Sequence, residues 1–423
     1  MIVTLTVLLC ISLALGMPIA LSMGLSAAGA LLIDGSVPMI VIAQKFYSSL
    51  DSFPLLAIPL FILAGAVMNV GGITERLIGL SRGLVGHVRG GLGQVNIITA
   101  FLFSTISGSA AAGAAAVGSM LIPEMEKDGY RKEDAAVITA ASAILGPIVP
   151  PSILAVIYAS MTGLSIGTLF LAGIGPGILI TIVLMAWVYL MARSRNIRIY
   201  PRASLAQMAT ALRRSIPALI MPAIIIGGII SGVFTATEAG AIAVAYGVAY
   251  AVVTRRCTLR IFIANVTRAA IASSSIMVIL GGASLFGWII AREGVPAMLA
   301  AWLQGVTASA DAVMALILVA LMVIGIFIEP IPALVMLVPV LTPIISAYGF
   351  EPYHFATVVM YATLLGSLSP PVAVLVLIAA KIARVVYART TRPLLPIFFA
   401  LCAVLILIAF LPWITLAPIR LFL

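Results

Sequence analysis

The sequence predicts an all-α integral membrane protein built from two similar halves. Of its 423 residues, 63% are hydrophobic and only 9% are charged, whereas about 25% of the residues of a soluble domain are charged. Apolar stretches of about 20 residues, the length that spans a bilayer as a helix, recur along nearly the whole chain. We expect about eleven or twelve embedded segments, some of them half-length. Because no stretch alternates polar and apolar residues with a period of two, the pattern does not favour a membrane β-barrel.

A pattern of proline and glycine repeats at an interval of 220 residues, as from Pro123 to Pro343 and from Pro151 to Pro371. Such interruptions at corresponding places of two halves are typical of the broken helices of secondary transporters. We therefore predict an internal duplication, with residues 1–190 as the first repeat and 215–423 as the second. If each half has an odd number of crossings, the second repeat is inverted relative to the first. The remaining matched pairs are Gly129 with Gly349, Gly146 with Gly366, and Pro150 with Pro370.

In the first half, the apolar N-terminus has no basic region before it, so we expect a first membrane helix and not a cleaved signal peptide. Residues 99–124 consist largely of Ser, Gly and Ala and are too short for two ordinary spans, which predicts a re-entrant hairpin. Tight helix packing through small residues is the alternative, but it does not explain the recurrent proline pairs. Residues 134–161 contain Pro150-Pro151 and are expected to form two half-helices with an unwound middle.

The second half repeats this order. Residues 312–343 are interrupted between Gly325 and Pro332, which predicts a second hairpin, and residues 354–383 contain Pro370-Pro371, which predicts a second broken helix. Simple proline kinks remain the alternative for both proline pairs.

Basic residues set the expected orientation. Short loops rich in Lys and Arg stay in the cytoplasm, so residues 191–214 are expected to be a cytoplasmic linker and two further basic segments to lie on the same side. Because this placement explains the net charge of +10, nucleic-acid binding is not indicated. The three segments contain Arg193, Arg195, Arg198, Arg202, Arg213 and Arg214; Arg255, Arg256, Arg260 and Arg268; and Lys381, Arg384, Arg389 and Arg392.

The broken elements favour ion binding. An unwound middle frees backbone carbonyl oxygens, hairpin tips add hydroxyls, and a dehydrated hard cation binds through several oxygens at short range. We therefore predict two sodium sites. Their candidate ligands are Ser107, Ser109, Gly146, Val149 and Pro151 in the first half, and Gly325, Gly366, Ser369 and Val372 in the second.

Half-helix N-termini present unpaired N–H groups, which suits a carboxylate substrate. Candidate substrate contacts are Ser109, Pro150, Pro370 and Arg292. Arg292 has two open interpretations: a counter-charge for an anion, or a snorkelling side chain beside Glu293 at a helix end. Glu329, at the second hairpin tip, is a further functional candidate, whereas Glu238 is expected to cap a helix.

Enzyme chemistry is not indicated. The sequence has no nucleophile elbow, phosphate loop or paired-carboxylate motif, and we expect no cofactor and no metal other than sodium as coupling ion. His87 and His354 are expected in polar loops, without a second ligand at metal-binding spacing.

Over nearly its whole length the chain resembles the large membrane subunit of TRAP (tripartite ATP-independent periplasmic) transporters. The resemblance is carried, among other stretches, by IPLFILAGAVMNVGGITERLIGLSRG, ISGSAAAGAAAVGSMLIPEMEKDGY, LGPIVPPSI and TATEAGAIAV. It implies a multi-pass protein of the bacterial inner membrane that imports an organic acid, such as a C4-dicarboxylate or sialic acid, by a sodium-coupled elevator mechanism. It also implies two partners, a small four-helix membrane subunit and a periplasmic substrate-binding protein. The candidate sodium ligands of both halves match the family's two sodium sites by position.

The chain departs from the family pattern in several places. Ala110 and Gly113 stand where the family usually has Ser and Asp, Ala373 where it has Gly, and Glu329 where it has Asp. Ser369 replaces a Thr and keeps the hydroxyl, so we expect ion binding to persist and the preferred ligand to differ.

The sequence is also compatible with two other classes of transport protein. A solitary sodium/carboxylate symporter of related architecture needs no binding protein. An ion channel needs a continuous pore, whereas paired hairpins with unwound helices favour alternating access.

Overall fold

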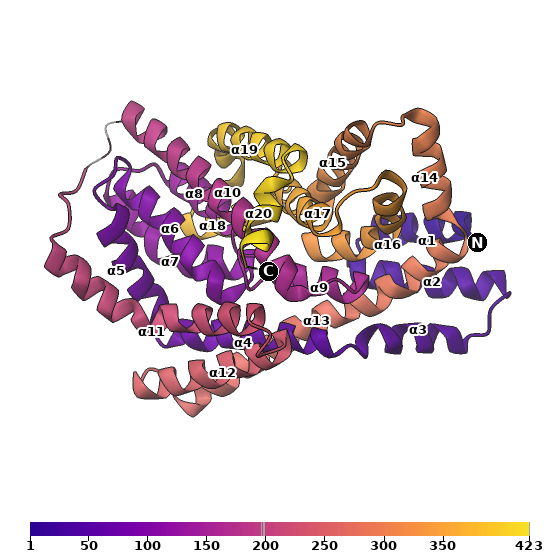
Figure 1. The fold of residues 1–423 in the computed structure, drawn as a ribbon, viewed down its shortest axis with the longest axis horizontal. Helices are drawn as coiled ribbons and strands as arrows, with labels where there is room; N and C mark the ends of the chain where they lie inside the picture. Colours follow the sequence, from indigo (N-terminus) through magenta and orange to yellow (C-terminus); the bar gives the residue numbers. More distant parts are fainter. Residues whose placement is uncertain (196, 198, 423) are drawn as a thin grey trace.

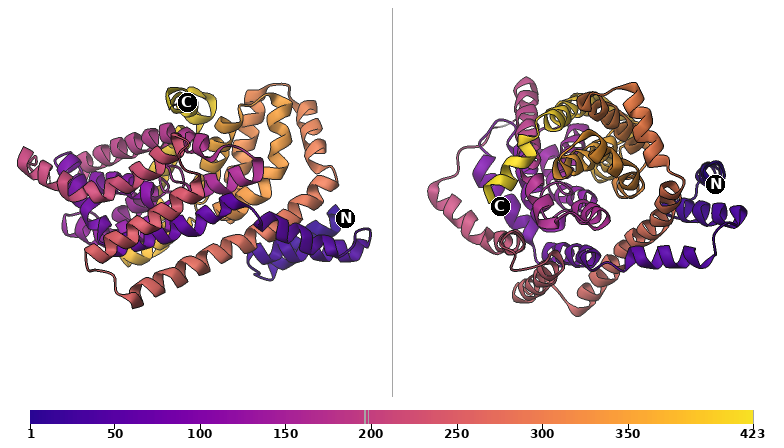
Figure 2. Two further views of the ribbon diagram at one scale, coloured as in Figure 1. Left: turned by 60° about the horizontal axis from the view of Figure 1, so that its bottom comes forward. Right: turned by 45° about the vertical axis from the view of Figure 1, so that its right-hand side comes forward.

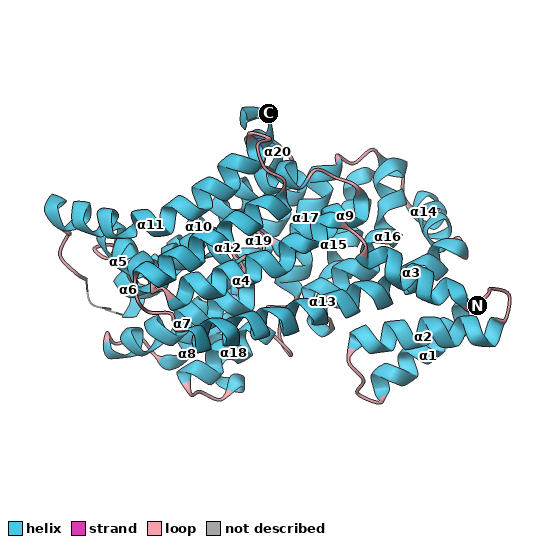
Figure 3. Ribbon diagram, turned by 90° about the horizontal axis from the view of Figure 1, so that it is seen from below, coloured by secondary structure: helices cyan, strands magenta, loops and turns pink. Residues whose placement is uncertain are grey.

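The computed structural model describes residues 1–195, 197 and 199–422. In this part of the chain all regular structure is helical, which confirms the predicted all-α class (Figure 3). Arg198, which we assigned to the basic linker, lies outside the described residues.

Eight helices of the described part are long and apolar enough to cross a membrane. One begins as the 3₁₀ turn η1 (Phe53–Leu56) and continues as α4 (Ala57–Val70). The others are α10 (Ile166–Arg195), α11 (Leu205–Ile230), α12 (Ala236–Val253), α13 (Leu259–Arg292), α15 (Ala310–Phe327), α16 (Pro330–Tyr348) and α19 (Tyr387–Phe410).

The remaining helices are shorter than 18 residues, or too polar to count among the spans. Several of them are halves of an interrupted apolar segment. They are α1 (Ile2–Ala14), α2 (Ile19–Asp34), α3 (Ile40–Leu50), α5 (Ile73–Val85), α6 (Gly91–Ser107), α7 (Ala110–Lys127), α8 (Lys132–Ala143), α9 (Ile153–Thr162), α14 (Val295–Val306), α17 (Pro352–Gly366), α18 (Val374–Ala383) and α20 (Trp413–Phe422).

Each half contains a helical hairpin followed by an interrupted helix. The hairpins are α6–α7 and α15–α16, and the interrupted helices are α8–α9 and α17–α18. Residues 144–152 and 367–373, which contain the two proline pairs, separate the arms. Proline cannot donate a backbone hydrogen bond, so a helix does not continue through either pair. Both Pro–Pro peptide bonds are cis.

The second arm of each interrupted helix packs against the other half of the chain. α9, from the first half, packs against α16 and α17 of the second, and α18, from the second half, packs against α7 and α8 of the first. The hairpins and interrupted helices therefore form one central bundle.

Longer helices lie on the outside of this bundle. α4, α11, α12 and α13 lie along one side of the molecule (Figure 1). α13 has 34 residues, so it is about 51 Å long, well beyond the thickness of a hydrocarbon core. It contacts α2, α3, α4 and α16 and runs along the edge of the molecule (Figure 2). α12 begins with the expected cap, because the Glu238 carboxylate accepts hydrogen bonds from the Thr235 N–H and hydroxyl.

A buried polar cluster joins the first hairpin to the first interrupted helix. The Asn96 amide on α6 donates to the Thr139 hydroxyl at 2.8 Å and accepts from the Ser142 hydroxyl at 2.9 Å, both on α8. All three side chains are buried, so these bonds fix the position of α8 against α6.

Candidate functional site

The first candidate site is the contact between the tip of α6–α7 and the unwound segment 144–152. α6 ends at Ser107, and Gly108 reverses the chain with a φ of +59°. Ser109 then begins α7, where its hydroxyl accepts from the Ala112 N–H. A methyl group placed on Gly108 would lie 2.7 Å from the Pro151 carbonyl oxygen, and one on Gly146 would lie 2.8 Å from the Ser109 carbonyl carbon. Only glycine permits this approach of two backbones.

Several oxygens at this contact have no partner. The Ser107 hydroxyl is buried and makes no hydrogen bond in the described structure. The carbonyl oxygens of Gly146, Val149 and Pro151 likewise accept none from the described residues. A buried polar group without a partner costs about 1–3 kcal/mol, and unpaired hydroxyl and carbonyl oxygens are the ligands that a hard cation takes.

The second candidate site has the same backbone contact. A methyl group on Gly325 of α15 would lie 2.9 Å from the Gly366 Cα at the end of α17, so the two helices touch through backbone atoms. Here the Gly366 carbonyl accepts from the Ser369 N–H at 2.9 Å, and the Ser369 hydroxyl donates to the Pro370 carbonyl. Val372 is half-buried, as Ser109 is at the first site.

A cavity of about 990 Å³ lies between the two hairpin tips. Ser107 and Ser109 line it from the first hairpin, Glu329 from the second, and Ser367 from the break after α17. α13 closes another side with Asn265 and Arg268. Both halves thus contribute their broken elements to a single cavity.

Not every candidate residue lies at this cavity. Arg292 is at the end of α13, where its guanidinium lies 5.6 Å from the Trp288 ring centre and donates to the Ser36 hydroxyl. Glu293 pairs with the N-terminal ammonium group at 3.8 Å instead of with Arg292. Pro150 is buried and Pro370 half-buried, and neither is among the residues that line the cavity.

The expectation for His354 is wrong. His354 lies in the first turn of α17, is only 3% exposed, and makes hydrogen bonds with the Thr415 hydroxyl at 2.9 Å and the Ala409 carbonyl at 3.1 Å. α20 returns to cover it, a long-range contact with no sequence signal. His87 is half-buried in the turn between α5 and α6.

Sequence reasoning missed the cavity role of Arg268. We grouped it with the basic segment before α13, but it lies nine residues beyond Leu259, inside the helix. In the described structure Arg268 and Glu329 are the charged residues that line the cavity, and Arg268 makes no hydrogen bond or ion pair there. The sequence feature that could have identified Arg268 is its position after about two turns of mostly apolar helix.

The fold defines a multi-pass membrane protein in which broken helices of both halves line one cavity. A family model described as "Tripartite ATP-independent periplasmic transporter, DctM component" matches residues 6–414. The chain therefore belongs to the DctM family, the large permease subunits of TRAP transporters. It is accordingly a secondary-transport permease of the inner membrane and not an enzyme.

Named relatives support this assignment. The sialic acid TRAP transporter large permease SiaM of Vibrio cholerae is 38% identical, with 96% of each chain covered. The C4-dicarboxylate large permease DctM of Pseudomonas aeruginosa is 34% identical, with 94% of this chain and 93% of that one covered. The solved YdaH transporter of Alcanivorax borkumensis matches with a TM-score of 0.61 over 89% of this chain and 88% of that one, at 16% identity, which shows a shared fold.

Proposed function

We propose that the chain imports an organic acid across the inner membrane by sodium-coupled transport, with substrate delivered by a periplasmic binding protein. The observation that carries the proposal is the set of unpaired oxygens at the first hairpin tip and in the unwound segment that touches it. The Ser107 hydroxyl and the carbonyls of Gly146, Val149 and Pro151 offer hard oxygen ligands, and Ser109 lies beside them. Gly325, Gly366, Ser369 and Val372 would hold a second ion in the other half.

Replacing Ser107 with alanine is expected to raise the sodium concentration for half-maximal uptake about ten-fold, because one oxygen ligand to a cation is lost. Without sodium, the thermal stability of this variant should not fall, since the hydroxyl has no partner within the described protein. Both quantities are measured on purified protein, by uptake and by melting with and without sodium.

Ser104→Ala is the matched control. Ser104 is one turn earlier on α6 and equally buried, but its hydroxyl donates to the Phe101 carbonyl and does not line the cavity. Equal sodium dependence in Ser107→Ala, Ser104→Ala and the unaltered protein would refute a sodium site at the first hairpin.

The charge distribution supports inverted repeats for residues 1–190 and 215–423, joined by the linker at 191–214. Arg131 and Lys132 lie at the base of the first hairpin, where α8 begins, whereas residues 293–380, which include the second hairpin, hold no Lys or Arg. By the positive-inside rule, the two hairpins enter from opposite sides of the membrane. Their tips line the same cavity, as in alternating-access transporters with a site at the midplane.

We propose an elevator mechanism for this architecture. The moving unit would be the bundle of hairpins and interrupted helices, with hairpins about 99–124 and 312–343 and broken helices about 134–161 and 354–383. The fixed frame would consist of outer helices that contact one another, such as α4 with α12 and α13 with α2. The bundle would carry ion and substrate past this frame.

Arg268 offers a positive charge to an anionic substrate, and Glu329, the cavity's other charged residue in the described structure, forms no ion pair with it. Arg268 lines the cavity without a partner, and guanidinium groups bind carboxylates through paired hydrogen bonds. Relatives are named for sialic acid, C4-dicarboxylates and isethionate, all of which are acids. We assign substrate binding to Arg268 and Ser109. Arg292 lies at the end of α13, outside the cavity, and receives no role in substrate binding.

A fused relative supports the membrane partner. The isethionate permease DctMQ of Oleidesulfovibrio alaskensis is 36% identical, but this chain covers only 63% of it. We propose that a separate small membrane subunit supplies the additional segment and that a periplasmic binding protein completes the system.

Uptake of labelled organic acids into proteoliposomes that contain this chain and its small partner tests the proposal. With an inward sodium gradient and binding protein present, we expect accumulation, and omission of either should reduce it to background. Sodium-driven uptake without binding protein would instead establish a solitary symporter. Ion conductance that does not depend on the sodium gradient would establish a channel.

A further inference from the structure

A second cavity, of about 500 Å³, shares no lining residue with the first. It lies where the beginning of α8, the end of α10 and the beginning of α19 meet. Its polar lining consists of Arg131, Asp134, Arg195 and Arg392. Its apolar lining consists of Trp187, Leu190, Met191, Pro393 and Pro396.

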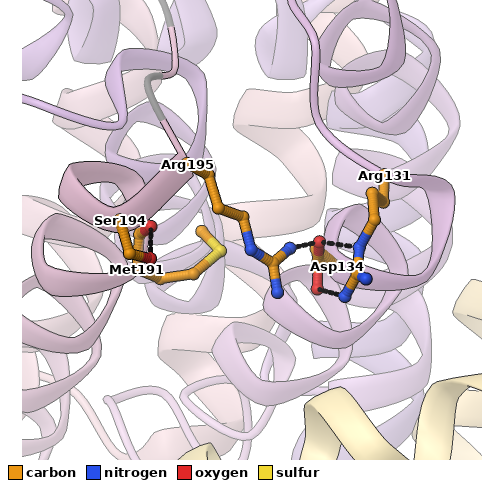
Figure 4. Close-up of polar contacts among 5 residues, drawn as sticks. All are labelled: Arg131, Asp134, Met191, Ser194 and Arg195. Carbon is orange, nitrogen blue, oxygen red and sulfur yellow. Dashed lines mark hydrogen bonds and ion pairs between the residues drawn. The ribbon is translucent and has the colours of Figure 1, made fainter.

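The charges in this cavity are not balanced. Asp134 is only 1% exposed and lies between two arginines (Figure 4). Arg131 donates to it from Nε at 2.9 Å and from a terminal nitrogen at 3.3 Å, and Arg195 pairs with the same carboxylate. Arg392 has no hydrogen bond or ion pair in the described part of the chain. One carboxylate therefore shares the cavity with three arginines, which leaves two positive charges to attract an anion.

The position of the cavity points to the membrane interface. Arg195 ends α10 at the basic linker, and Arg392 belongs to another segment that we expect on the cytoplasmic side. The adjoining wall is apolar, with Leu190 63% exposed and Trp187 half-buried one turn before Met191. Tryptophan is enriched at the level of lipid headgroups.

We propose that this cavity binds the headgroup phosphate of an anionic phospholipid from the cytoplasmic leaflet. Basic pockets between membrane helices on this side are suited to such headgroups, and guanidinium groups bind phosphate through paired hydrogen bonds. The apolar wall offers a surface for an acyl chain, which a free phosphate does not need. A lipid bound here contacts α8 of the first half and α19 of the second, and so stabilises the contact between the halves.

Arg392→Gln tests the proposal without breaking an internal ion pair. The full-length chain is purified in detergent, stripped of lipid and titrated with phosphatidylglycerol, and bound lipid is counted by native mass spectrometry. The dissociation constant should rise about five-fold in this variant, the effect of one arginine at an anionic surface. Arg389→Gln is the matched control, because Arg389 is exposed on the same helix but does not line the cavity.

Two further arms separate the possible ligands. Phosphatidylcholine should bind more weakly than phosphatidylglycerol, and inorganic phosphate at equal concentration should not displace the bound lipid. Equal affinity for the two lipids, or equal loss in both variants, would overturn the proposal. Full displacement by inorganic phosphate would identify a site for a soluble anion and would overturn it as well.

Discussion

Gly146→Ala is expected to reduce sodium-dependent uptake about 10- to 100-fold. The added methyl group would lie 2.8 Å from the Ser109 carbonyl carbon and 3.0 Å from the Ala110 nitrogen, so the hairpin tip must move. Overpacking a tight contact costs about 1–3 kcal/mol, and the middle of that range, about 1.4–2.7 kcal/mol, corresponds to a 10- to 100-fold change in an equilibrium constant. The loss should consist mainly of weaker sodium affinity, because the displaced atoms are those beside the unpaired oxygens. Uptake measured over a series of sodium concentrations checks this.

Gly113→Ala is the matched control for the same substitution type. Gly113 is on α7, one turn after the tip, and an added methyl group would meet only a Phe103 ring carbon at 3.9 Å, an ordinary contact. Its uptake should stay close to that of the unaltered protein. If Gly146→Ala retains full sodium affinity, the contact between hairpin tip and unwound segment does not form the ion site.

Arg268→Gln is expected to raise the KM for the transported acid about 10- to 150-fold, with sodium affinity unchanged. A hydrogen bond to a charged group contributes about 1.5–3 kcal/mol, and glutamine retains polarity but not the charge. Arg268→Lys should recover part of the loss, since lysine keeps the charge without the paired geometry. Initial uptake rates over a range of substrate concentrations give the KM directly.

Arg260→Gln serves as the control, because Arg260 is exposed near the beginning of the same helix and is not among the residues that line the cavity. An unchanged KM in Arg268→Gln would exclude this residue as the anion site. Failure of the transport proposal would look different. In that case neither the unaltered protein nor any variant would show sodium-driven uptake.

The sequence predicted the helical class, the membrane location and the family because these depend on patterns along the chain. Apolar runs of spanning length need no knowledge of contacts. A proline pair interrupts a helix wherever it lies, because the missing N–H is a property of the residue itself. The glycines at 146 and 366 were found by the same repeat, and both prove to be places where two backbones touch.

The tertiary structure alone decided which side chains meet. Arg268 lies inside α13 and Arg292 ends it, and the sequence does not say which of the two faces a cavity; the packed fold places Arg268 at the cavity and Arg292 beside Trp288. His354 is buried because α20 folds back over α17 from 61 residues away. The cavity that brings Arg195 and Arg392 to Asp134 likewise depends on helices that are distant in sequence. Periodicity and composition report how a segment relates to water or lipid, whereas a binding site depends on contacts between segments, which only the packed fold defines.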